Sequence, residues 1–135
     1  VEFLEYGSDP IEFGPFTIEP FAVVHCVSAF ALRVSAGGKT LVYSGDTGPC
    51  EQLVEAAMGA DLALFEASYL ERNDNPMNMH LTGADAAKAA TAAGVGRLVL
   101  THLVPWNDNE DVVADAAPHF SGDLIVAHAG LTLTV

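Results

Sequence analysis

Two apolar runs in this chain each lead into a residue that can bind a metal ion. Residues 41–43 (Leu-Val-Tyr) precede Asp46, and residues 98–100 (Leu-Val-Leu) precede His102. Such runs predict buried strands, and open α/β sheets bind ligands beyond the carboxyl ends of their strands. We therefore expect Asp46 and His102 to lie in one cleft. His80, just before a predicted helix start, adds a second imidazole.

The pattern that usually nucleates a hydrolytic zinc site is absent from the sequence. Such sites commonly begin with two histidines spaced two or four residues apart on one element. The five histidines of this chain include no such pair. The sequence therefore predicts half of a metal site.

The charge balance argues against a large nucleic-acid surface. Eighteen acidic residues oppose five scattered basic ones, which gives a formal net charge of −13. An attraction to phosphate backbones needs a basic patch, and none is visible in the sequence. Bound divalent cations would offset part of the negative field and could still hold one phosphate ester.

Composition predicts one domain, residues 1–135, in the cytoplasm. Half of the residues are hydrophobic and only 17% are charged, enough to bury a core. Cys26 and Cys50 form no Cys-x-x-Cys pair, which favours a reduced compartment over a disulfide framework. No apolar stretch reaches membrane-spanning length. The strand-like start at residues 1–6, without Met or a basic leader, suggests a processed chain or a fragment and not a signal peptide.

The first third of the chain predicts antiparallel β structure. Residues 16–19 and 21–25 flank Pro20, which implies an edge strand or a break between two strands. Residues 30–34 alternate in polarity, and Gly37-Gly38 predicts a hairpin into the next strand, residues 39–44.

After Asp46 the pattern predicts alternating helices and strands. Pro49 is expected at the first position of a helix, and Thr82-Gly83-Ala84-Asp85 resembles a capping box. This order is typical of an α/β (α+β) fold with a mixed sheet and outer helices. The expected helices are 51–58, 86–93 and 109–117, and the expected strands are 61–66, 97–101, 123–127 and a final edge strand at 131–135.

Each candidate site residue also has a structural interpretation. Asp46 could be a turn or N-cap aspartate, because Gly-Asp-Thr-Gly-Pro is typical of such turns. A lone histidine at a strand end or in a loop is often structural, which applies to His102 and His80. Glu66 follows a buried strand, where its carboxylate either caps a backbone group, pairs with a cation or orients an imidazole.

The remaining histidines and one acidic segment are weaker candidates for the functional site. His25 ends an early strand and could approach the cleft, whereas surface or structural roles are expected for His119 and His128. Residues 107–111 superficially resemble a calcium loop but lack its central glycine and terminal glutamate. A helix cap is the better interpretation.

Four motifs, taken in order, resemble the C-terminal half of a metallo-β-lactamase-fold hydrolase. The branch they most resemble is that of the ribonuclease Z-like phosphodiesterases, including bacterial cyclic-nucleotide phosphodiesterases. Residues 25–34 also resemble the strand pair that precedes the Gly-Asp-Thr turn in this family. The four motifs are Ser44-Gly45-Asp46-Thr47, Phe65-Glu66-Ala67-Ser68-Tyr69, His80-Leu81-Thr82 and Leu100-Thr101-His102.

The resemblance implies a role for each site residue. Asp46 would bridge two divalent metal ions, usually zinc, with manganese or iron as alternatives, and His102 would bind one of them. His80 would donate a proton to the leaving oxygen, and Glu66 would orient His80. The nucleophile would be a hydroxide bound to the two metal ions.

The family's His-x-His-x-Asp-His motif belongs to the N-terminal half and is absent from this chain. The resemblance therefore implies half of an αββα sandwich whose apolar sheet face needs a partner, either the missing N-terminal half or a second copy. Asp46 and His102 alone offer too few ligands for stable zinc binding, so the isolated chain is expected to be inactive and to bind no metal.

Two classes of function remain open from the sequence. The first is hydrolysis of a small phosphodiester or nucleotide by a parent protein that contains this chain. The second is a non-catalytic fragment or scaffold module, since the first-half ligands are missing. Among enzymes, thioester or lactam hydrolysis is less favoured, because His80 and Glu66 suit a phosphodiester leaving group better.

Overall fold

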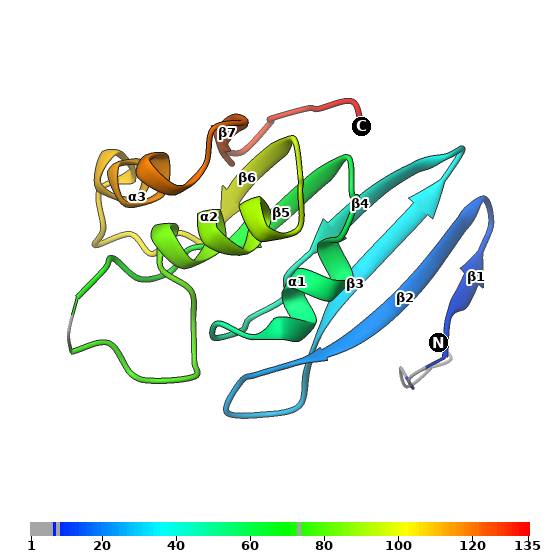
Figure 1. Cartoon of the computed structure of the whole chain (residues 1–135), viewed down its shortest axis with the longest axis horizontal. Coiled ribbons are helices and arrows are strands. Elements are labelled where there is room, and N and C mark those ends of the chain that lie inside the picture. Colours follow the sequence, from blue (N-terminus) through cyan, green and yellow to red (C-terminus); the bar gives the residue numbers. More distant parts are fainter. Residues whose placement is uncertain (1–6, 8, 73) are drawn as a thin grey trace.

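The computed structural model describes residue 7, residues 9–72 and residues 74–135, so the strand-like segment expected at residues 1–6 lies outside the described residues. Within them, one seven-stranded sheet runs in sequential order from β1 to β7 (Figure 1). The strands are β1 (Ile11–Phe13), β2 (Phe16–Val23), β3 (Ala29–Ala36), β4 (Lys39–Tyr43), β5 (Leu62–Glu66), β6 (Arg97–Thr101) and β7 (Asp123–Val126). The helices are α1 (Glu51–Ala57), α2 (Gly83–Ala92) and α3 (Asn109–Ala116), the last followed by a 3-10 turn, Ala117–His119.

Strands β1 to β4 form the antiparallel meander that the sequence predicts. Gly37 and Gly38 make the two-residue hairpin loop, with Ala36 opposite Lys39. Strand β2 continues through Pro20 without a break. Among the described residues β1 pairs with residues 16–18 of β2, so Pro20 lies where β2 is an edge of that part of the sheet, which confirms the edge alternative.

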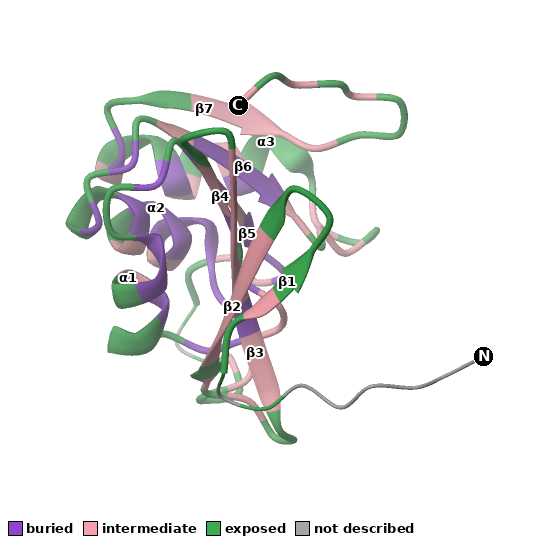
Figure 2. Ribbon diagram, turned by 90° about the vertical axis from the view of Figure 1, so that its right-hand side faces the viewer, coloured by how far each residue is buried: buried purple, intermediate pink, exposed green. Residues whose placement is uncertain are grey.

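Strands β4 to β7 are parallel and carry the helical crossovers, which confirms the predicted mixed α/β sheet with outer helices. Figure 2 shows α1 and α2 on one side of the sheet. Under them, alternate strand residues form the core, including Val42, Phe65 and Leu100. Small side chains let α2 approach the sheet closely, and Ala86 and Ala90 are fully buried.

The opposite face of the parallel strands is also apolar. Residues 41, 62, 64 and 99 from three strands line a cavity of about 280 Å³ on this side. Residues 131–135 also line it, and the predicted edge strand there is wrong, because these residues adopt no regular structure. The Arg97 guanidinium instead donates to the carbonyl of Thr134 at 2.9 Å, so the segment is held over the sheet face rather than beside β7.

The helix starts follow their capping residues. Thr82 and Asp85 form the predicted capping box, with the Thr82 hydroxyl accepting from the Asp85 N–H at 3.0 Å. Asp108 caps α3, as expected for the acidic segment. The expected position of Pro49 is wrong: Cys50 is the N-cap of α1, with extended backbone, so the helix begins after both residues. None of the helices in the described part of the chain is long and apolar enough to cross a membrane.

Gly45 connects the end of β4 to Asp46 and leaves no room for a side chain. Its φ is 61°, and a Cβ there would lie 2.6 Å from the carbonyl oxygen of Phe30 in β3. The Gly-Asp turn is therefore packed against the neighbouring strand.

We expect Gly45→Ala to lower the free energy of unfolding by about 1–3 kcal/mol, because it adds backbone strain and a clash. Chemical denaturation measures this. Gly96→Ala is the control, since a Cβ at Gly96 meets nothing within 4 Å. Equal denaturation midpoints for the two variants would contradict the packing argument.

Candidate metal centre

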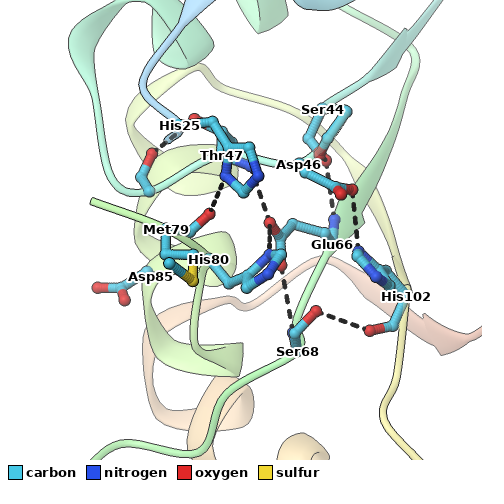
Figure 3. A network of polar contacts seen from close by, with 12 residues as sticks. His25, Ser44, Asp46, Thr47, Glu66, Ser68, Met79, His80, Asp85 and His102 are labelled. Atoms are coloured by element: carbon cyan, nitrogen blue, oxygen red, sulfur yellow. Dashed lines mark hydrogen bonds and ion pairs between the residues drawn. The ribbon is translucent and has the colours of Figure 1, made fainter. Parts of the chain in front are cut away.

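The carboxyl ends of three neighbouring parallel strands bring the predicted site residues together (Figure 3). Asp46 follows β4 by three residues, Glu66 ends β5, and His102 comes directly after β6. His80 comes from the loop before α2. The sequence argument from strand ends therefore correctly predicts that Asp46 and His102 meet.

Asp46 and His102 form a partly exposed pair. Oδ1 of Asp46 lies 3.0 Å from Nδ1 of His102, and their side chains are 43% and 41% exposed. His102 has a left-handed backbone with φ of 53°, which is uncommon for a residue with a side chain. Its carbonyl accepts a hydrogen bond from the Ser68 hydroxyl at 2.9 Å. Strain of this kind is found most often at functional sites.

Glu66 is fully buried and connects the parts of the site. Its Oε1 accepts the backbone N–H of Thr47 at 2.8 Å, and its Oε2 accepts that of Ser68 at 3.3 Å. Nδ1 of His80 lies 2.8 Å from the same Oε1. The N–H of Glu66 donates to the Ser44 hydroxyl at 2.9 Å. The sequence left three roles open for Glu66. In the structure its carboxylate orients the His80 imidazole and also accepts hydrogen bonds from two backbone N–H groups.

His80 is held in one orientation by these contacts. Because a carboxylate accepts, Nδ1 of His80 is assigned as the donor to Glu66. Its Nε2 is therefore the ring nitrogen left for a metal ion or a substrate oxygen. The rings of Tyr69 and His102 each stand edge-on to it, with centroids 5.2 Å away.

The charges of two carboxylates reach Tyr43 at the edge of the site. Partial burial, followed by the charges of Asp46 and Glu66, raises the pKa of the Tyr43 phenol above its usual 10.0. The same carboxylate charges would favour a bound cation.

Asp46, His80 and His102 form a partial metal-binding group. One donor atom from each lies within 4.8 Å of the others. Carboxylate oxygen and imidazole nitrogen are donor types that zinc binds in proteins. Manganese and iron accept the same donor types. Across residues 7, 9–72 and 74–135 the group has three members, the number of protein ligands that a single catalytic zinc ion commonly has, and a second ion would need further donors.

The sequence analysis assigned no individual role to the small polar residues that support the site. Ser44, Thr47 and Ser68 are buried next to apolar strands. A small polar residue at the end of an apolar run is the sequence signal that could have identified them. His25 does approach the cleft, with its ring centroid 5.2 Å from that of His80. His128 is exposed, and its Nδ1 lies 3.1 Å from the neighbouring carbonyl oxygen of residue 129.

Comparison with known proteins defines the family. A family model for the beta-lactamase superfamily domain matches residues 7–103. An uncharacterized protein of Mycobacterium leprae (strain TN) is 43% identical over 128 residues, which cover 94% of this chain and 45% of that protein. A ribonuclease Z of Bradyrhizobium diazoefficiens is 39% identical over 98 residues, covering 71% of this chain and 33% of that protein. The chain belongs to the metallo-β-lactamase superfamily, as its four motifs predict.

A solved structure of a relative confirms the partial fold. The "Probable metallo-hydrolase YhfI" of Bacillus subtilis (strain 168) is 30% identical over 121 residues, 90% of this chain and 50% of that protein. Its crystal structure superposes with a TM-score of 0.87, covering 92% of this chain and 52% of the other. The chain thus spans about half the length of these relatives, or less.

We expect Glu66→Gln to lower the free energy of unfolding of the complete protein by about 1–3 kcal/mol, because a buried amide N–H₂ would replace one acceptor oxygen and leave donors unpaired. Chemical denaturation measures the change. Glu55→Gln is the matched control, since Glu55 is exposed on α1. If Glu66→Gln were as stable as this control, Glu66 would not hold the site together.

Proposed function

We propose that the complete protein is a metal-dependent phosphodiester hydrolase, to which this chain contributes Asp46, His102, His80 and Glu66. The observation that carries the proposal is the 2.8 Å contact between Glu66 and Nδ1 of His80, beside the Asp46–His102 pair. An imidazole oriented by a buried carboxylate can act in acid–base catalysis, and the neighbouring oxygen and nitrogen donors suit a divalent cation.

Asp46 and His102 would hold the metal ions, with zinc expected and manganese or iron as alternatives. A bound divalent cation would lower the pKa of a water molecule and withdraw charge from a phosphoryl oxygen. Asp46 would contribute its carboxylate to this site, and residues outside this chain would supply the remaining ligands.

His80 would donate the proton that the leaving oxygen requires. In the imidazolium form, Nδ1–H remains bonded to Glu66 and Nε2–H is free to donate to the substrate. The Glu66 carboxylate would fix the ring and stabilise its positive charge. An alkoxide is a poor leaving group without a proton, whereas the thiolate of a thioester leaves without one. A phosphodiester is therefore favoured over a thioester.

The proposed substrate is a small phosphodiester or a nucleotide. The similarity to a ribonuclease Z supports phosphodiester chemistry. The net charge of −13 disfavours a large RNA surface on this chain.

The proposal includes a partner for the second sheet face, which residues 131–135 cover in part. This chain spans 45% of the Mycobacterium leprae relative. In this chain the sheet face opposite α1 and α2 is apolar. We infer that an N-terminal half, or a second copy of the chain, covers that face. The competing function is a non-catalytic scaffold, which the three-member donor group leaves open.

Two substrates that differ in leaving group test the proposal in the complete protein loaded with zinc or manganese. We expect Asp46→Ala to lose bound metal and to stop hydrolysis of both bis(p-nitrophenyl) phosphate and a cyclic nucleotide. His80→Ala should keep its metal and lose about 10²–10⁴-fold in kcat on the cyclic nucleotide, whose alkoxide needs a proton. The kcat of His80→Ala on the nitrophenyl ester should fall much less, because nitrophenolate is weakly basic and leaves without a proton. Steady-state kinetics and metal analysis measure these effects.

The matched control is His119→Ala, which removes a histidine outside the cluster and should match the wild type. Loss of metal in His80→Ala would make His80 a ligand and not the proton donor. The absence of hydrolysis in the wild type, with metal binding no greater than in Asp46→Ala, would overturn the proposal in favour of the scaffold.

A further inference from the structure

A pocket adjoins His80 on the outer side of the metal centre. It has a volume of about 330 Å³, and its walls come mostly from the segment between β5 and α2, with His80 among the residues that line it. This volume is at the lower end of the range for small-molecule sites. Because His80 is the proposed proton donor, the pocket can receive the part of a substrate that carries the leaving oxygen.

Arg72 is the basic residue that lines this pocket. Within residues 7, 9–72 and 74–135, each of the other four basic side chains lies 2.7–3.9 Å from a carboxylate oxygen, whereas Arg72 forms no such pair. The cation of this part of the chain that has no carboxylate partner therefore lies beside the proposed proton donor. The four pairs are Arg33–Glu19, Lys39–Asp61, Lys88–Glu71 and Arg97–Asp123.

The two carboxylates that line the same pocket have partners other than Arg72. Oε1 of Glu71 lies 3.9 Å from Nζ of Lys88. Oδ2 of Asp85 accepts the hydroxyl of Thr82 at 2.8 Å and its backbone N–H at 3.2 Å. Neither carboxylate pairs with the Arg72 guanidinium, which is exposed and accessible to an anion from solution.

The residues just before Arg72 are anchored to the rest of the structure. The backbone N–H of Glu71 donates to Oδ2 of Asp115 on α3 at 2.7 Å. The carbonyl of Leu70 accepts the side-chain amide of Asn75 at 2.7 Å. These two hydrogen bonds hold the backbone that carries Arg72 at the wall of the pocket.

We propose that Arg72 binds a phosphate group of the substrate in this pocket. Its planar guanidinium stays charged at neutral pH and presents paired N–H donors that match two phosphate oxygens. The inference rests on the proposed hydrolase function, which supplies a substrate that contains phosphate. The phosphate is either the scissile one or a second one carried by the leaving group, and the same chemistry recognises both.

The first experiment measures binding and needs no catalysis. Isothermal titration calorimetry compares adenosine 3′,5′-bisphosphate with adenosine on the complete protein and on Arg72→Gln and Arg72→Lys. The matched control is Lys39→Gln, which also removes one positive charge but lies in the wall of a different cavity, with Phe16 and Val135.

We expect the preference for the bisphosphate over adenosine to fall about tenfold in Arg72→Gln, because a charge-assisted hydrogen bond is lost. Arg72→Lys should fall less, since it keeps the charge without the planar fork. Lys39→Gln should match the wild type, and the affinity for adenosine should be unchanged in all three variants. A wild type that binds both ligands equally, or an Arg72→Gln variant that matches Lys39→Gln, would overturn the proposal.

The second experiment identifies which phosphate Arg72 binds. The dinucleotides ApA and pApA differ only in a terminal phosphate. If Arg72 holds that second phosphate, Arg72→Gln should raise KM about tenfold on pApA alone, with kcat unchanged. If it holds the scissile phosphate, kcat should fall on both dinucleotides. Unchanged kinetics on both would count against any phosphate contact. If the wild type hydrolyses neither, the proposed function fails, but the calorimetry still decides the role of Arg72.

Discussion

The site depends on the buried carboxylate of Glu66. A buried charge is costly unless it is hydrogen-bonded, and here the backbone of Thr47 and Ser68 and the ring of His80 all donate to it. These donors come from the turn after β4, the segment after β5 and the loop before α2. One carboxylate therefore fixes three segments that the chain topology brings to the same edge of the sheet.

The Asp46–His102 pair contrasts with this buried centre. A polar contact this exposed to water contributes little stability, so its geometry must come from the backbone. The left-handed conformation of His102, its bond from Ser68 and the packing of Gly45 against β3 supply that geometry. The result is a largely buried Glu66–His80 pair beside a partly exposed Asp46–His102 pair, an arrangement that leaves the second pair accessible to a cation from solvent.

The meeting of Asp46 and His102 at the strand ends was predictable because buried parallel strands are apolar runs whose carboxyl ends share one edge. The hairpin at Gly37-Gly38 was predictable because local turn chemistry determines it. The conformation of residues 131–135 was not predictable, because a segment with alternating apolar residues can cover a face of the sheet without pairing with a strand. The contact of His25 with Met79 joins residues far apart in sequence, and the positive φ of His102 leaves no sequence signal.

The most direct test of this account is the zinc anomalous signal in crystals of the complete protein. We expect a zinc peak at roughly 2.0–2.2 Å from Asp46 and His102. The Glu66 carboxylate should stay hydrogen-bonded to Nδ1 of His80 and away from the metal. A peak bound to Glu66, or zinc present in the crystal with no peak at Asp46, would contradict the account.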